Sequence, residues 1–190
     1  MEVDLDNTVA RMESLDGSEK VSLNDLIVRA VQQSLVAHPQ LNVMFDAERV
    51  TPIQGHSVGL AVATAEEVVA PVVQASLDED IVVLAEQMSE VIARARNGKL
   101  TRADHIPTAI TVSNLGMYGV RDFTAMVTPP QVMVLSVGAI RRTPVFNDAN
   151  EVIARSIITL TLGSDHRVIN GVQAANFLGS VKSYLECSEN

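Results

Sequence analysis

The strongest constraint on the fold of this 190-residue chain is a block of strand patterns, about residues 42–75, between two helical patterns. The helices are predicted over Ser22–His38 and Asp80–Asn97, because apolar residues recur in both at helical spacing. Within the block, Val58–Thr64 is almost continuously apolar, which favours a strand buried on both faces. Strands that follow one another in this way exclude the regular strand–helix alternation of a parallel Rossmann sheet.

The remainder of the chain continues the mixed order of elements. Residues 1–6 resemble the end of a strand, and a short helix is predicted at about Asn7–Ser14, ended by Asp16-Gly17-Ser18. Further elements are predicted at Val43–Phe45 and Arg49–Ile53 (a hairpin), Ala109–Ser113, Val132–Val137, Val152–Leu162 after a turn at Asn147–Asn150, and Asn170–Leu185, a helix. We therefore expect a single-domain α+β fold, with helices packed on a mixed β-sheet.

Composition and charge limit the classes of partner. The formal net charge of −9 argues against nucleic acid and against an anionic membrane, because both favour a basic surface. Local basic groups for a phosphorylated ligand remain at Arg94, Arg96, Lys99 and Arg102, and at Arg141 and Arg142. The single cysteine, the lack of a signal segment and the lack of a bilayer-spanning apolar run lead us to expect a soluble intracellular protein.

Histidines are the residues that point most directly to chemistry. His38 precedes a proline at a predicted helix end, where capping or packing is the expected role, and His56 and His105 lie in polar stretches that we expect to be exposed. His166 differs, because it follows a strand and precedes a turn and a helix, a place where sites are often built. No two histidines have metal-ligand spacing with an acidic third ligand, so no metal site is predicted.

A family resemblance appears at Asp165-His-Arg-Val-Ile-Asn-Gly171. This segment resembles the DHRxxDG active-site signature of the dihydrolipoamide acyltransferases, the E2 components of 2-oxo acid dehydrogenase complexes. Further landmarks of that family follow in the same order along nearly the whole chain: His38-Pro-Gln-Leu-Asn42, Gly59-Leu-Ala-Val-Ala-Thr64, Ala70-Pro-Val-Val73, Ala93-Arg-Ala-Arg-Asn-Gly-Lys-Leu100, Thr111-Val-Ser-Asn-Leu-Gly-Met-Tyr-Gly119, Pro129-Pro130-Gln131 and Val137-Gly138-Ala139-Ile140.

The resemblance implies a chloramphenicol-acetyltransferase-like fold and a homotrimer with active sites between subunits. Coenzyme A would be one substrate, and a lipoyl group presented by a separate lipoyl domain would be the other. The E1 and E3 components of the complex would be further partners, in a bacterial or archaeal cytoplasm or in the mitochondrial matrix. Residues 1–190 would then be a single catalytic domain that is shortened at its N-terminus and has no lipoyl or subunit-binding domain.

Site residues follow from the same resemblance. His166 is expected to act as the general base, since a neutral imidazole can take a proton from a thiol and return it. Ser113 is expected to donate a hydrogen bond to the oxyanion, from a neighbouring subunit. Asn114, Gly138 and Ile140 fall at positions that line the coenzyme A channel in the family, although turn and strand architecture would also explain them.

The signature departs from the family at position 170. Asn170 stands where aspartate is usual, and it keeps an acceptor oxygen but loses the charge. Asp165 and Arg167 are expected to order the loop, and Gly171 to permit a tight entry into the last helix. Three readings stay open: an active E2-type acyltransferase, a non-catalytic E2-like structural or binding subunit, and a free-standing acetyltransferase for a small molecule.

Overall fold

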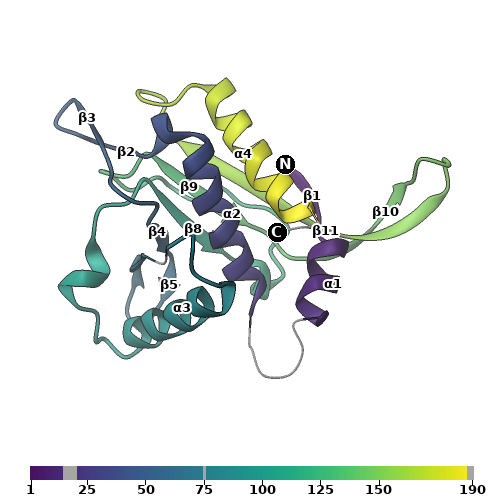
Figure 1. Cartoon of the computed structure of the whole chain (residues 1–190), viewed down its shortest axis with the longest axis horizontal. Helices are drawn as coiled ribbons and strands as arrows, with labels where there is room; N and C mark the ends of the chain where they lie inside the picture. Colours follow the sequence, from purple (N-terminus) through teal and green to yellow (C-terminus); the bar gives the residue numbers. More distant parts are fainter. Residues whose placement is uncertain (15–20, 75, 188–190) are drawn as a thin grey trace.

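The structure, a computed structural model, describes residues 1–14, 21–74 and 76–187. In this part of the chain, seven strands form one mixed sheet (Figure 1). Its central path runs in the order β1 (Glu2–Asp4), β11 (Val152–Ser164), β9 (Met133–Val137), β8 (Ile110–Asn114), β4 (Val58–Leu60) and β7 (Val72–Val73), and β10 (Arg141–Phe146) also pairs with β11. β8 runs parallel to both β4 and β9, and the other pairs are antiparallel.

β9 and β10 pair with successive parts of the same edge of β11, and a bulge separates them. Val137 lies opposite Leu160 and Arg141 opposite Ile157, so the β9–β10 side contains one extra residue. Gly138 donates its backbone N–H to the Thr159 carbonyl at 3.0 Å. Beyond the bulge, the β10–β11 hairpin projects away from the rest of the molecule (Figure 1).

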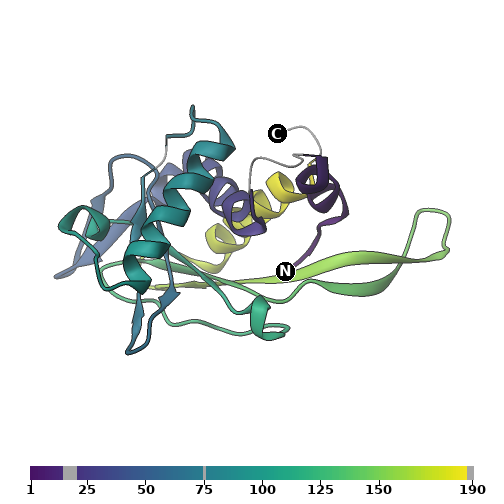
Figure 2. The same ribbon diagram turned by 90° about the horizontal axis from the view of Figure 1, so that it is seen from below.

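Helices cover one face of the sheet, as Figure 2 shows. They are α1 (Asp6–Ser14), α2 (Leu23–Ala37), α3 (Ile81–Arg96) and α4 (Gly171–Glu186). The segment at 115–132 crosses the opposite face, where Ala125 donates its N–H to Ser136 Oγ at 3.0 Å. The largest fully buried side chains between the layers include Phe177, Ile27, Leu35, Leu84, Ile158 and Leu160.

The ends of the two long helices follow from their local sequence. The Asp25 carboxylate accepts hydrogen bonds from the Ser22 N–H and hydroxyl at 2.6 and 2.7 Å, at the start of α2. Burial raises the pKa of Asp25, against the effect of these bonds. At α3, Asp80 accepts from the N–H of Val82, and Gly98 follows the helix with a φ of +64°, which glycine adopts readily.

The predicted elements are largely confirmed, with one correction at Val58–Thr64. That run is divided at Ala61 into β4 and β5 (Val62–Ala63), which pairs with β6 (Val68–Val69). The register is unbroken, because Val58 faces Val73 and Val62 faces Val69, but Pro71 lacks an N–H and the ladder loses a bond there. Only the β4 part is fully buried.

The hairpin around residues 46–48 is present as β2 (Val43–Asp46) and β3 (Arg49–Pro52). The break expected at residues 16–18 lies outside the described residues. Among the helices that are described, none is long and apolar enough to cross a lipid bilayer.

Candidate active site

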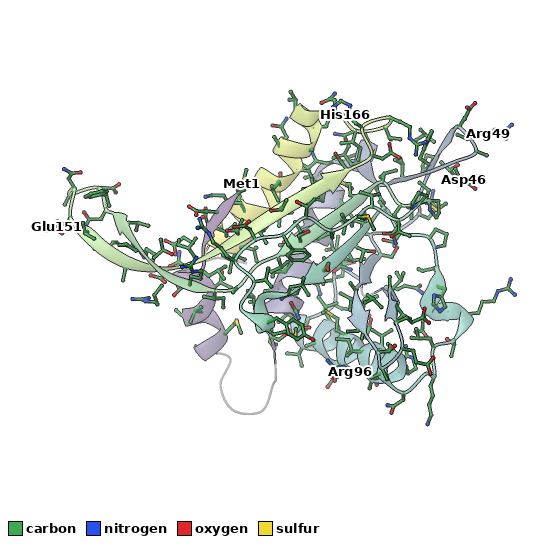
Figure 3. The ribbon with its side chains drawn as sticks, turned by 180° about the vertical axis from the view of Figure 1, so that it is seen from behind. Met1, Asp46, Arg49, Arg96, Glu151 and His166 are labelled. Carbon is green, nitrogen blue, oxygen red and sulfur yellow. The ribbon has the colours of Figure 1, made fainter. Side chains whose placement is uncertain are left out.

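His166 lies exposed at the tip of a tight turn between β11 and α4 (Figure 3). Asp165 donates its N–H to the Val132 carbonyl at 2.9 Å, which ties the start of the turn to the strand end. The Val168 and Ile169 N–H groups both donate hydrogen bonds to the Asp165 carbonyl, at 3.0 and 2.9 Å. Since Ile169 is fully buried, both ends of the turn are fixed while the imidazole faces outwards.

Asp165 and Arg167 pair across His166. Arg167 donates from Nε to Asp165 Oδ1 at 2.9 Å, from Nη2 to Oδ2 at 2.6 Å and from its backbone N–H to Oδ1 at 3.0 Å. These side-chain bonds lower the pKa of Asp165 and raise the pKa of Arg167. The pair orders the loop, as the sequence predicts.

Asn170 is the N-cap of α4. Its Oδ1 accepts the N–H of Gln173 at 2.9 Å, and Gln173 Oε1 accepts the N–H of Asn170 at 3.0 Å. Asparagine and aspartate cap helices about equally well, so this position does not demand a charge for the fold. The role expected for Gly171 is wrong within this chain, because a Cβ there would meet no atom within 4 Å and its φ is not positive.

Ser113 and Asn114 lie at the end of β8, beside a cavity of about 200 Å³. Within the described part of the chain, the half-buried Ser113 hydroxyl has no hydrogen-bond partner. Asn114 donates from Nδ2 to Asn24 Oδ1 at 2.6 Å and accepts the N–H of Gly116 at 2.7 Å. Asn24, in the first turn of α2, is a residue that sequence reasoning missed, because nothing local links it to β8.

Ser113 and His166 of one chain lie at opposite ends of the sheet. Ser113 is level with Ser136, which is level with Thr161, and β11 continues for three more residues to Ser164. At about 3.3 Å per residue and about 4.8 Å between strands, the Cα atoms of Ser113 and Ser164 are roughly 14 Å apart. His166 lies farther on, and Figure 3 shows it far from Arg96, which lines the Ser113 cavity.

Gly138 and Ile140 occupy different surroundings. A Cβ on Gly138 would lie 1.9 Å from the Arg121 carbonyl oxygen, and a Cβ on Gly116 would lie 2.6 Å from the Gly138 carbonyl oxygen. Gly138 therefore packs against the loop that follows Asn114. Ile140 instead borders an open apolar groove with residues of α1 and the start of α2, away from the Ser113 cavity. Of these two residues, Gly138 lies near Asn114 within one chain, and Ile140 does not.

The other histidines take structural or surface positions. His38 Nε2 lies 2.8 Å from Ser180 Oγ, and its ring meets Phe177 edge-on, so the packing role is confirmed. His105 is exposed as expected, but His56 is half-buried. In the described residues, no group of three or more histidine, cysteine or acidic side chains is arranged to hold a metal ion.

Residues 55–59 spell a glycine-x-serine-x-glycine pattern, but their geometry does not form a nucleophile elbow. An elbow exposes its serine between a strand and a helix. Ser57 is instead buried ahead of β4, and its hydroxyl donates to the Pro107 carbonyl at 3.0 Å. Its own carbonyl accepts the Thr108 hydroxyl at 2.7 Å. Ser57 therefore joins two loops and is not available as a nucleophile.

Two of the six basic residues singled out in the sequence, Arg94 and Arg142, form ion pairs within the described part of the chain. Arg94 Nη2 lies within hydrogen-bond distance of the buried Asp104 carboxylate, at 2.5 Å, and Arg94 also approaches Glu90. Arg142 lies 3.8 Å from Asp6. Arg94 thus anchors the end of α3 to the following loop, and it does not contribute to a phosphate-binding patch.

Comparison with known proteins identifies the family. The family described as 2-oxoacid dehydrogenases acyltransferase (catalytic domain) matches residues 1–190. The acetyltransferase component of the pyruvate dehydrogenase complex of Rickettsia felis is 34% identical over 185 residues, 97% of this chain and 44% of that protein. The lipoamide acyltransferase component of the branched-chain alpha-keto acid dehydrogenase complex of Bacillus subtilis is 32% identical over 192 residues, covering 98% and 45%. The chain thus spans less than half the length of these relatives.

Solved structures of dihydrolipoamide acetyltransferases have the same fold as this chain. A probable dihydrolipoamide acetyltransferase of Listeria monocytogenes superposes with a TM-score of 0.91 at 28% identity, covering 100% of this chain and 84% of that one. The dihydrolipoamide acetyltransferase of Azotobacter vinelandii gives 0.89 at 25% identity, covering 100% and 79%. That structure belongs to an investigation of a serine, a histidine and, four residues later, an asparagine in the catalytic mechanism of that enzyme.

The fold extends beyond these proteins. Chloramphenicol acetyltransferase gives a TM-score of 0.61 at 14% identity over 97% of this chain and 86% of that one, which confirms the expected chloramphenicol-acetyltransferase-like α+β fold. The match to the catalytic-domain family over all 190 residues, together with the fold, decides the affiliation: the chain belongs to the 2-oxoacid dehydrogenase acyltransferase family and corresponds to its catalytic domain.

Proposed function

We propose that this chain transfers an acyl group between a dihydrolipoyl thiol and coenzyme A, as a catalytic domain within a 2-oxo acid dehydrogenase complex. The observation that carries the proposal is the His166 turn. The turn that carries this exposed imidazole is held at a sheet end by the Asp165–Arg167 pair and by the cap of α4. A fixed and accessible histidine is what proton transfer to and from two incoming thiols requires.

The chemistry can be written with these residues. A thiol with a pKa near 8.5 is mostly protonated at neutral pH, so neutral His166 takes its proton as sulfur attacks the thioester carbonyl carbon. The tetrahedral oxyanion then accepts a hydrogen bond from the Ser113 hydroxyl. When the intermediate collapses, the carbon–sulfur bond of the first thioester breaks, and the departing thiolate recovers the proton from His166.

This mechanism requires two copies of the chain at each site, since one copy holds His166 and Ser113 roughly 14 Å or more apart. A homotrimer, in which each copy offers His166 to one neighbour and Ser113 to the other, supplies both groups three times. The projecting hairpin supports self-association, because Phe146 and Val152 face each other there with 71% and 64% of their surfaces exposed.

The substrates fit the surroundings of Ser113. The cavity there combines apolar side chains with the amides of Asn24 and Asn114. That mixture suits a flexible arm with amide groups, as in coenzyme A. The dihydrolipoyl group would arrive at His166 on a separate lipoyl domain, and the E1 and E3 components would be partners of the assembled complex.

Position 170 bears on the choice between an active acyltransferase and a non-catalytic E2-like subunit. The observations on Asn170 favour the active enzyme. In this chain it lies four residues after His166. The Azotobacter vinelandii acetyltransferase also has an asparagine four residues after the histidine under investigation in its catalytic mechanism. Asparagine at this position is thus compatible with a family enzyme, and here it begins α4 with a complete cap.

The test measures acyl transfer from acetyl, succinyl and branched-chain acyl coenzyme A to free dihydrolipoamide. We expect turnover with at least one donor and a loss of about 1,000-fold or more in His166→Ala. The control is His105→Ala, which alters an exposed histidine on η2 (Arg102–His105). A folded, self-associated chain without turnover on any donor would favour the non-catalytic subunit. Turnover that survives His166→Ala would remove the proposed base.

A further inference from the structure

The Arg167 guanidinium is held on two sides. On one side it forms the bidentate pair with Asp165. On the other, its Cζ atom lies 4.5 Å from the centre of the Phe45 ring, within the range of a cation–π contact. The Arg167 side chain is 64% exposed, so the ion pair alone would be weak and free to rearrange in water.

Phe45 is itself fixed. It lies in β2, is half-buried and packs against the hydrophobic core. Its N–H donates to the Pro130 carbonyl at 2.9 Å, and two residues later the Val132 carbonyl accepts the N–H of Asp165. The ring and the His166 turn are therefore attached to the same short stretch, residues 130–132.

The β2–β3 hairpin lies beside the turn. Figure 3 places Asp46 and Arg49, at the hairpin turn, on the same side of the molecule as His166. Through Phe45, an element distant in sequence thus contacts the turn. A guanidinium clamped between a carboxylate and a ring restricts the peptide groups on both sides of His166.

We propose that Phe45 is a positioning residue: its ring holds Arg167 against Asp165 and so fixes the direction in which His166 presents its imidazole. The inference rests on the proposed function, with His166 as the base. Loss of the ring leaves both substrates able to bind, but it lets the turn adopt orientations in which the imidazole does not reach the reacting thiol. The effect therefore falls on kcat and not on KM.

The test compares Phe45→Leu with Phe45→Tyr in the acyl-transfer assay. Phe45→Leu keeps apolar bulk but removes the ring face, and we expect kcat to fall about three- to tenfold with KM for both substrates within about twofold. Phe45→Tyr keeps the ring face and should restore at least about half of the parent kcat. The matched control is Val50→Ala, since Val50 faces Phe45 across the hairpin but is exposed on β3. It should leave both constants unchanged.

Arg167→Lys tests the same contact from its exposed side. Lysine keeps the charge but loses the planar fork, and we expect a similar fall in kcat. The kcat of the double variant Phe45→Leu/Arg167→Lys should fall no further than that of the more impaired single variant, because either single change already removes the contact between Phe45 and Arg167. If thermal unfolding shows that Phe45→Leu is not folded at the assay temperature, the single variant Arg167→Lys decides the matter, and a parent-like kcat in that variant would overturn the inference.

Two outcomes with the Phe45 variants also overturn the inference. One is a parent-like kcat in folded Phe45→Leu, and the other is an equal loss in Phe45→Leu and Phe45→Tyr, which would show that the ring face is immaterial. His166→Ala, assayed in parallel, separates a failure of the positioning role of Phe45 from a failure of His166 as the proposed base. If His166→Ala is inactive and Phe45→Leu is normal, only the positioning role fails. If His166→Ala is active, the proposed base fails first.

Discussion

Asn170 and Gln173 cap the start of α4 reciprocally, with side-chain to backbone hydrogen bonds of 2.9 and 3.0 Å. The cap ends the turn that carries His166, so the residue that departs from the family signature also shapes the site. An aspartate would make the same bond and would add a favourable charge at the helix N-terminus. The substitution therefore leaves the local fold intact.

Asn170→Ala should lower the free energy of unfolding by about 1 kcal/mol, since it removes the cap acceptor. Asn170→Asp should stay within about 0.5 kcal/mol of the parent, because the acceptor is kept. Urea unfolding followed by circular dichroism measures both. Equal stability of the parent and Asn170→Ala would show that the cap contributes nothing. In the acyl-transfer assay, an unchanged rate for Asn170→Asp would show that the departure is catalytically neutral.

Two glycines of the site region should respond in opposite ways to alanine. Gly138→Ala forces a Cβ to within 1.9 Å of the Arg121 carbonyl oxygen, so backbone must move, and we expect a loss of about 1–3 kcal/mol in stability. Gly171→Ala places its Cβ in open space and is the matched control, with an expected change of less than about 0.5 kcal/mol. Thermal unfolding of both variants gives the comparison. Similar melting temperatures would contradict the close approach at Gly138.

The pair formed by Arg94 and Asp104 should make stability depend on acid pH. The Arg94 side chain lowers the pKa of Asp104 from 3.8 to about 2, with help from the Thr101 donors. A lowered carboxyl pKa means that the stabilisation is complete above pH 3.8 and is lost as pH falls towards about 2. Asp104→Asn should therefore be less stable than the parent by roughly 2 kcal/mol at pH 6, and by progressively less below pH 4.

The control for that pair is Glu90→Gln, because Glu90 approaches the same arginine but its side chain is 75% exposed. Its removal should change stability by less than about 0.5 kcal/mol at every pH. Urea titrations at pH 6, 4 and 3 supply the values. A gap between the parent and Asp104→Asn that stays constant with pH would contradict the lowered pKa.

Local patterns predicted the elements well, because they carry local information. Ser22 with Asp25, Pro39 and Gly98 mark helix ends by bonds and dihedral angles that involve near neighbours. The division at Ala61 was missed because it depends on Pro71 in the facing strand. Periodicity within one strand does not record which residue lies opposite.

The surroundings of the candidate site could be predicted only in part. The resemblance pointed to His166 and Ser113 as candidates, but it did not reveal two contacts from residues distant in the chain: Phe45 with the His166 turn and Asn24 with the end of β8. For Ile140, the position in a family motif did not reveal that the side chain borders a separate groove. Such relationships arise from packing, which a linear pattern does not contain.

The most direct test of the account is complementation between two inactive variants. If His166 and Ser113 act from different copies, His166→Ala and Ser113→Ala chains co-expressed in equal amounts should form mixed assemblies that contain some intact sites. With random mixing, about a quarter of the sites combine both intact groups, so the rate should recover to about a quarter of the parent rate. Each variant alone should be slower than the parent by about 100-fold or more. A mixed preparation that is as inactive as the separate variants would contradict a site shared between copies.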